Sequence, residues 1–313
     1  MMAAEGGDVV VTVRYVYRGE EGEIIPREAT HIFVLARVIL GHAFDMHPNI
    51  VEVICHEDVE IVGEYAFYGC PNLRRVVMPG VRILERAALC NCPALTDVEC
   101  GKLEIIGEDA FWHCVSLTRI DLQSAMIVEK LAFTYCKALV EAKFGNKLER
   151  IEESALSACL SLERITIPLK AGFITNADIF IECGNLKRVD LVEGEVHETI
   201  AAFQLEEWRN DMNEVIESIN ETLPNARAGG YDEDFNKDEG EKARAIRRWS
   251  RSVIRKIIRY QAEHRRVLDE AATTLQFALP QDIAMNHVLP FLELPHSLDE
   301  EDQEMEDEDG DDE

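Results

Sequence analysis

The sequence has no long hydrophobic run. Its longest apolar stretch, Ile32 to Leu40, has nine residues and contains Arg37. A membrane-spanning helix needs about 20 consecutive apolar residues, so we expect no membrane span. The first eight residues also have neither the basic region nor the apolar core of a secretory signal peptide. We therefore expect a soluble protein of the cytoplasm or, alternatively, of the nucleus.

The sequence also has little that points to catalysis. It contains no P-loop, no G-x-S-x-G, no H-E-x-x-H and no dinucleotide-binding fingerprint. Residues 232–238 begin like a calcium-binding loop, but Lys237 stands where that loop requires glycine. The nine histidines are scattered along the chain. From these absences we predict a protein that is not an enzyme and that needs neither a cofactor nor a metal ion.

Basic residues are scarce relative to acidic ones. The chain has 32 Lys and Arg against 60 Asp and Glu, which gives a net charge of −28. Twelve of the last fifteen residues, 299–313, are acidic and none is basic. Such a segment buries too little apolar surface to offset its ordering entropy, so we predict a disordered acidic tail over 299–313. The overall charge argues against nucleic acid as a partner.

What the sequence does contain is an internal repeat of 22 to 24 residues. Residues 59–80 read VEIVGEYAFYGCPNLRRVVMPG, and residues 103–124 read LEIIGEDAFWHCVSLTRIDLQS. Because each such unit covers the apolar face of its neighbour, the repeat predicts an α/β solenoid with a parallel sheet on one side. About seven rungs fill residues 36–194. They begin near Ala36, Val59, Val81, Leu103, Ala125, Leu148 and Ala171.

The repeat columns predict which side chains form the core. An alanine column marks a tight bend, and a column of phenylalanine and leucine follows it directly. Each of these large side chains contributes about 2 kcal/mol or more of transfer free energy when it is buried. A leucine column then precedes a short strand whose alternate residues point inward. The phenylalanine and leucine column consists of Phe44, Phe67, Leu89, Phe111, Phe133, Leu156 and Phe180.

The shared pattern I-x-x-x-A-F-x-x-C-x-x-L-x-x-V-x-I resembles the BspA-type leucine-rich repeats. The N-terminal run VVVTVRYVYRGEEGEIIPREATHIFV and the later segment VLPFLELP are similar to those of many such proteins in eukaryotic algae. The resemblance covers roughly residues 9–298. It implies a solenoid fold with a binding role, and it implies little about the partner.

Six of the nine cysteines fall in one repeat column. A metal or redox ladder is one interpretation, but zinc sites need four ligands that converge from close pairs. A column of small, buried, apolar thiols is the interpretation we favour. Cys90 lies in a variable position instead, so we expect it to be the most accessible thiol. The column contains Cys70, Cys92, Cys114, Cys136, Cys159 and Cys183.

The outward strand positions carry two columns of polar side chains. In the first column the sign of the charge alternates through six rungs. Neighbours about 4.8 Å apart can form ion pairs that stabilise the stack, and the same face can bind a polar partner. A second, smaller patch around Tyr68 and Trp112 is more simply explained as packing. The predicted partner-binding residues are Arg75, Asp97, Glu99, Arg119, Asp121, Glu141, Lys143, Arg164 and Arg188.

The two ends of the repeat region should be capped. Within residues 9–35, apolar and polar side chains first alternate, a turn follows at 18–22, and a second apolar stretch comes after it. This pattern predicts a β-hairpin cap. After Gly194 the periodicity becomes helical, and residues 195–298 form a predicted helical cap. Its first helix, near 198–223, is acidic, and its second, near 241–278, has an arginine-rich face. These helices could also form a dimer, so the sequence leaves monomer and homodimer open.

Three hypotheses account for the basic face of the second helix. It could bind nucleic acid or an anionic membrane surface, it could be a basic targeting signal, or it could pair with the acidic helix and tail. We favour the internal pairing. For the whole chain the leading prediction is a protein–protein interaction scaffold that binds a polar, mixed-charge protein or peptide. The alternative is a regulatory or chaperone-like protein that binds basic clients through its acidic tail and C-terminal helices.

Overall fold

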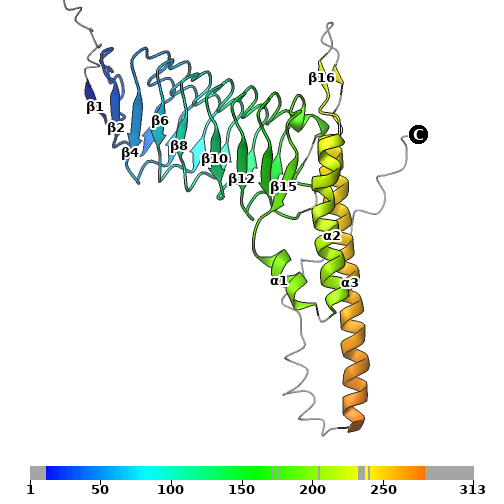
Figure 1. The fold of residues 1–313 in the computed structure, drawn as a ribbon. Coiled ribbons are helices and arrows are strands. Elements are labelled where there is room, and N and C mark those ends of the chain that lie inside the picture. The colour runs from blue at the N-terminus through cyan, green and yellow to red at the C-terminus, as the bar shows by residue number, and fades with distance from the viewer. Residues whose placement is uncertain are drawn as a thin grey trace, which may run out of the picture.

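A computed structural model describes residues 12–170, 172–174, 176–203, 205–231, 237–238 and 240–278. The predicted acidic tail, 299–313, lies outside the described residues, as do the core of the calcium-like segment, 232–236, and the end of the predicted helical region, 279–298. In Figure 1 a right-angled molecule is seen, with a stack of parallel rungs in one arm and two long helices in the other. The predicted solenoid of about seven rungs is confirmed.

The longer strands form two parallel sheets on one side of the solenoid (Figure 1). The first has the order β1-β2-β4-β6-β8 and the second the order β10-β12-β14-β15, so the hydrogen-bonded ladder is interrupted between β8 and β10. The first sheet consists of β1 (Arg14–Tyr17), β2 (His31–Val34), β4 (Glu52–Cys55), β6 (Arg75–Val77) and β8 (Asp97–Glu99). The second consists of β10 (Arg119–Leu122), β12 (Glu141–Phe144), β14 (Arg164–Ile167) and β15 (Arg188–Leu191).

Two-residue strands form a third parallel sheet within the same rungs. Its inward residues, Val62 and Ile106 among them, are buried, so this sheet covers a second side of the core. In order along the chain it contains β3 (Val38–Ile39), β5 (Ile61–Val62), β7 (Ile83–Leu84), β9 (Ile105–Ile106), β11 (Ile127–Val128) and β13 (Arg150–Ile151).

The predicted core columns lie inside the solenoid. All seven members of the phenylalanine and leucine column are at most 1% exposed. Phe44 stacks on Phe67 with ring centroids 4.8 Å apart, and Phe111 stacks on Phe133 at 5.0 Å. The residue directly before each alanine lies in a tight bend and has left-handed backbone conformation, which residues other than glycine adopt rarely. These residues are His42, Tyr65, Ala87, Asp109, Leu131 and Ser154.

The N-terminal cap is not a hairpin. β1 pairs with β2 in parallel register, Arg14 opposite His31 and Tyr17 opposite Val34. The predicted turn at residues 18–22 is present, because Glu23 N donates to Glu20 O at 3.0 Å. However, the chain then continues through residues 24–30 and returns in its original direction. The cap is therefore one more rung of the parallel sheet.

The described part of the C-terminal region contains three α-helices where two were predicted. The first predicted helix is divided into α1 (Glu195–Ala202) and α2 (Glu206–Thr222), because Phe203 has extended backbone. The Phe203 ring is fully buried and packs edge-on against Trp208 and Tyr260, which stabilises the break. The second predicted helix is α3 (Lys242–Ala278), as expected. Short elements accompany these helices: η2 (Leu223–Asn225), β16 (Gly230–Tyr231) and β17 (Lys237–Asp238). The last rung of the solenoid contains η1 (Ala177–Phe180).

The helices pack against the last rungs of the solenoid. α2 contacts β15, α3 contacts η1, and α2 runs along α3 (Figure 1). One side of α3 is apolar and buried, from Ile246 to His264. Two apolar residues of the helical region are exposed instead, Leu205 at 47% and Val267 at 48%. Leu205 precedes α2 and Val267 follows the part of α3 that α2 covers, so neither faces a partner helix.

Candidate interaction face

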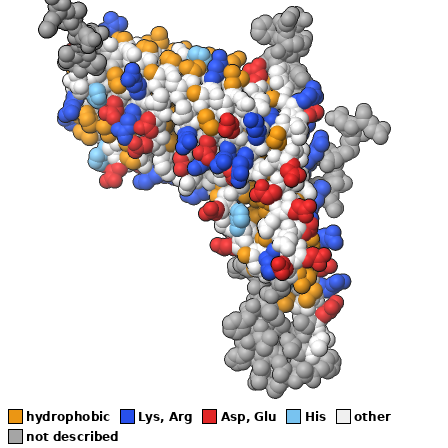
Figure 2. Space-filling view, in the orientation of Figure 1, with side chains coloured by type: hydrophobic (Ala, Val, Ile, Leu, Met, Phe, Trp, Pro, Cys, Tyr) orange, Lys and Arg blue, Asp and Glu red, His pale blue; other side chains and the backbone are white. Residues whose placement is uncertain are grey.

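The strand register brings the predicted outward columns into rows. Glu52 lies opposite Arg75, and Arg75 lies opposite Asp97. In the second sheet Arg119, Glu141, Arg164 and Arg188 follow one another in the same way. Figure 2 shows acidic and basic side chains intermixed across this side of the solenoid. The structure thus places the predicted site residues on one surface, in two groups divided by the break between β8 and β10.

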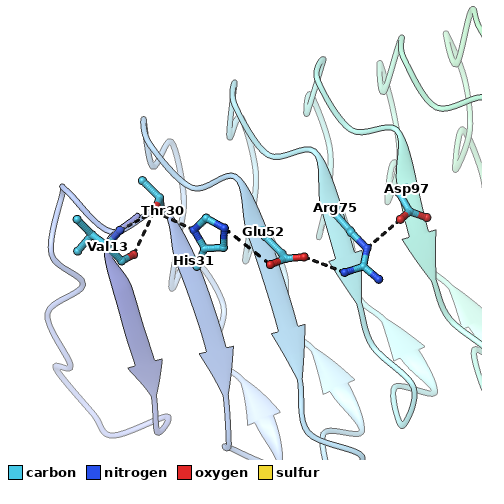
Figure 3. A network of polar contacts seen from close by, with 6 residues as sticks. All are labelled: Val13, Thr30, His31, Glu52, Arg75 and Asp97. Atoms are coloured by element: carbon cyan, nitrogen blue, oxygen red, sulfur yellow. Dashed lines mark hydrogen bonds and ion pairs between the residues drawn. The ribbon is translucent and has the colours of Figure 1, made fainter. Parts of the chain in front are cut away.

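The group in the first sheet is a closed network centred on Arg75 (Figure 3). Its guanidinium donates to Glu52 at 2.8 Å, to Asp97 at 2.9 Å and to Glu99 at 2.5 Å. Hydrogen bonds from Glu52, Glu99 and Asp97 raise the pKa of Arg75 above its ordinary value. His31 extends the row, with its ring 3.8 Å from Glu52. The donors of Arg75 are therefore largely occupied within the protein.

The group in the second sheet is more loosely paired. Arg164 lies 3.4 Å from Asp190 and 3.9 Å from Glu141. Arg188 contacts the same Asp190 at 2.7 Å, and this hydrogen bond raises the pKa of Arg188. Arg119 is exposed and has no ion pair within the described part of the chain. Two arginines thus share one carboxylate here, and a third arginine is unpaired.

The two further predicted residues of this group are also exposed. Lys143 lies 3.7 Å from Glu141, a long contact for an ion pair. Asp121 accepts hydrogen bonds from the backbone and side chain of Gln123, at 3.2 and 3.3 Å, and so folds back on its own strand. Lys143 is therefore free to turn toward a ligand, whereas Asp121 is held in place.

A groove of about 800 Å³ lies where this second sheet meets the helices. Its walls come from β12, β14 and β15 on one side and from His197 of α1 and Ile216 and Glu217 of α2 on the other. Asn220 of α2 fixes this junction by accepting a hydrogen bond from the backbone N of Val189 at 2.9 Å. Four predicted site residues line the groove: Glu141, Lys143, Arg164 and Arg188. Sequence reasoning missed the groove because it did not place α1 and α2 beside the sheet.

The cysteine column is buried. Each of its six thiols donates a weak hydrogen bond to a backbone carbonyl of the preceding rung, as Cys70 does to Phe44 O at 3.1 Å and Cys136 to Phe111 O at 3.2 Å. Burial raises the pKa of both thiols to about 12. Cys90 is only 5% exposed, so its predicted accessibility is wrong. Within the described residues no group of three or more His, Cys, Asp or Glu could hold a metal ion.

Lys242 is a buried cation that the sequence did not reveal. Its side chain is 1% exposed, and its Nζ donates to Leu186 O at 2.7 Å and to Leu223 O at 2.9 Å. Burial lowers the pKa of Lys242. The ammonium group thereby connects the start of α3 to the last rung and to the end of α2.

The patch around Tyr68 and Trp112 is mostly packing. Both side chains are half-buried, and Trp112 packs edge-on against Tyr135 at 6.0 Å. Tyr135 is 37% exposed.

Among the described helices none is long and apolar enough to cross a membrane.

Parallel rungs of 22 to 24 residues, with leucine, phenylalanine and cysteine columns inside, define a leucine-rich-repeat solenoid. Six copies of the BspA type Leucine rich repeat region match residues 37–130 and 104–210, which together make up more than half of the chain. The chain therefore belongs to the BspA-type leucine-rich repeat family.

Similar solved structures come from bacteria. A leucine-rich repeat protein of T. pallidum is 27% identical over 45% of this chain and 69% of its own, with a TM-score of 0.41. A leucine-rich cell surface protein of Faecalibacterium prausnitzii A2-165 is 24% identical, with 57% of this chain and 47% of its own covered and a TM-score of 0.44. A leucine-rich repeat protein of Bacteroides ovatus ATCC 8483 is 19% identical. The match covers 54% of this chain and 47% of that protein, with a TM-score of 0.37. This chain spans about half the length of the latter two. No curated protein matches it.

Proposed function

We propose that this protein is a non-enzymatic protein–protein interaction scaffold that binds a polar, mixed-charge protein or peptide through the strand face of its solenoid. The observation that carries the proposal is the groove of about 800 Å³ between the second sheet and α1–α2. Extended faces of repeat solenoids are their usual binding surfaces. Leucine-rich repeat proteins are in general protein-interaction scaffolds, which supports this assignment.

The ligand should engage the second sheet rather than the first. Around Arg75 three carboxylates already occupy the guanidinium, so a ligand would have to displace them. Arg119 is unpaired among the described residues, and Arg164 and Arg188 share Asp190. Because each guanidinium has five donors in a rigid fork, these arginines retain donors for a ligand carboxylate or carbonyl. We therefore assign ligand binding to the predicted partner-binding residues of the second sheet.

The groove favours an extended segment that carries both signs of charge. Acidic side chains of Asp190, Glu193 and Glu217 line it together with the three basic ones. The half-buried Ile216 adds apolar surface to the groove. A ligand with alternating charges can pair with both sets, whereas a uniformly charged polymer would meet repulsion from one of them. A polar peptide segment of a partner protein fits this pattern.

A photo-crosslinking amino acid at Thr166, which lines the groove, tests the proposal. The captured partner is then purified, and its affinity is measured by titration calorimetry. We expect Arg164→Glu/Arg188→Glu to weaken binding at least about tenfold, equivalent to about 1.4 kcal/mol. The control is Arg37→Glu/Arg86→Glu, in which two exposed, similarly paired arginines lie elsewhere. Equal weakening by both double variants, or none by the first, would refute binding in the groove.

The alternative function, binding of basic clients through the acidic tail and C-terminal helices, has one supporting observation. Glu207, Glu214 and Glu221 of α2 are exposed and form no ion pairs within the described chain. Affinity for polylysine that falls when these three are replaced by glutamine would favour it. Cytoplasmic or nuclear residence, the monomer or homodimer state and the resemblance to algal proteins stay predictions.

A further inference from the structure

A stripe of arginines runs along the exposed side of α3. Arg248, Arg255 and Arg259 are spaced by seven and four residues, which places them on one side of the helix over about 16 Å. All three are exposed, and none has an ion-pair partner among the described residues. Basic side chains are visible along the outer edge of the helical arm (Figure 2). The stripe is a run of positive charge on a chain whose net charge is −28.

The acidic helix α2 does not neutralise this stripe. α2 packs on the opposite, apolar side of α3, where Trp249 Nε1 donates to Val215 O at 3.0 Å. The described ion pair between the two helices is Lys256 with Asp211, at 2.6 Å. Tyr260 donates to the same carboxylate. α2 therefore supplies no described ion pair to the stripe, although Arg259 is close enough to help lower the pKa of Asp211. The most acidic segment of the chain, 299–313, is a further candidate partner.

We propose that the acidic segment 299–313 docks on the Arg248–Arg255–Arg259 stripe of its own chain. The charges are complementary, since the segment carries twelve carboxylates and no basic residue. Like charges four residues apart, such as Arg255 and Arg259, destabilise a helix, and a bound acidic segment removes that repulsion. Guanidinium groups also bind carboxylates with two parallel hydrogen bonds.

The segment can reach the stripe. Measured along the helix, Arg259 and Arg248 lie about 28 and 45 Å from Ala278, where α3 ends. Residues 279–298 provide twenty residues of chain before the acidic segment, which can extend to roughly 70 Å. Tethering at this length gives an effective concentration in the millimolar range, which favours the same chain over a free partner. A docked segment would also shield the stripe from other polyanions, and salt would release it.

Spin labels at two introduced cysteines test the proposal in the full-length protein. Ala262→Cys places one label on the exposed side of α3 near Arg259, and Gly310→Cys places the other in the acidic segment. The nine native cysteines are buried, so the new thiols should be labelled selectively. A docked segment gives a label separation below about 25 Å, set by the length of the stripe. If the segment is undocked, about 24 Å of helix and a coil of about 30 Å lie between the two labels. The label separation is then broadly distributed near 40 Å.

Charge-neutralising variants identify the docking surface. Arg248→Gln/Arg255→Gln/Arg259→Gln should convert the short separation into the broad one, as should 1 M salt. Arg27→Gln/Arg37→Gln/Arg74→Gln removes three exposed charges from the solenoid and should leave the short separation unchanged. Circular dichroism checks that both triple variants are folded.

Three results would overturn the proposal. A broad distribution in the unsubstituted protein means that the segment does not dock. A short separation that persists in the α3 variant means that it docks elsewhere. A short separation that appears only when two singly labelled chains are mixed means that a second copy is the occupant. None of these results bears on the groove of the second sheet, so this inference and the proposed function can fail independently.

Discussion

At the scale of single residues, the cysteine column shows how a repeat position acquires a structural role. A small, buried, apolar side chain was expected there, and burial is confirmed for the six thiols of the column. The structure adds that each column thiol donates to a carbonyl of the preceding rung, for example Cys159 to Phe133 O at 3.2 Å. This bond favours cysteine over alanine, because the thiol adds a second donor to a carbonyl that already accepts the backbone N–H of Cys136. Sequence alone could not reveal it, since the acceptor lies about 26 residues away.

Lys242 provides a second test at this scale. We expect Lys242→Ala to reduce the free energy of unfolding by about 1–3 kcal/mol, because it removes the side-chain donor from the carbonyls of Leu186 and Leu223. The Leu223 carbonyl keeps its bond from the backbone N of Ala226. Urea unfolding followed by circular dichroism measures the change. Lys147→Ala, at an exposed position, serves as the control and should have little effect. Equal stability of the two variants would show that the ammonium contacts contribute nothing.

At the scale of elements, the phenylalanine and leucine column holds neighbouring rungs together. Phe111 is fully buried and stacks on Phe133 with planes 8° apart. We expect Phe111→Ala to reduce the free energy of unfolding by about 3–5 kcal/mol, because it leaves a cavity between two rungs. Phe111→Leu should cost less than about 1.5 kcal/mol, since leucine occupies the same column at positions 89 and 156. Denaturant unfolding measures both, and similar losses in the two variants would contradict the stacking argument.

Element boundaries and directions were the weaker predictions. The turn at residues 18–22 suggested a hairpin, yet β1 and β2 are parallel. Turn residues report only local backbone, whereas strand direction depends on the whole connection through residue 30. The helix break at Phe203 was missed for a related reason. Helical periodicity continues through it, and only the contacts of Phe203 with Trp208 and Tyr260 favour extended backbone there.

At the scale of the whole molecule, the buried thiols should lower the free energy of unfolding as the pH becomes alkaline. Burial raises their pKa, to about 12 for Cys55, Cys70 and Cys136, whereas the ordinary value is 9.0. The unfolded chain thus releases these protons first. The contribution of each thiol is fully present below pH 9 and is lost as the pH rises from 9 to about 12, by at most about 1.4 kcal/mol per pH unit. Lys242, whose pKa burial lowers, acts in the opposite sense, but it is a single group.

We therefore expect a lower urea midpoint at pH 10 than at pH 8, measured with a reductant present. The difference between the two midpoints should be smaller in a Cys70→Ala/Cys136→Ala variant, whatever the stability of that variant at pH 8. An unchanged midpoint in the unsubstituted protein would contradict the raised thiol pKa values.

The sequence by itself determined the repeat period, the solenoid, the buried columns and the surface on which the charged strand residues lie. These follow from side-chain periodicity, which is local and recurs in every rung. Tertiary structure decided the rest. It showed that Arg75 is held by three carboxylates, while Arg119 has no ion-pair partner among the described residues. It also showed that α1 and α2 close one end of the strand face into a groove, and that α2 contacts the apolar rather than the arginine side of α3. Such pairings depend on contacts between elements far apart in the chain, and a repeat pattern does not encode them.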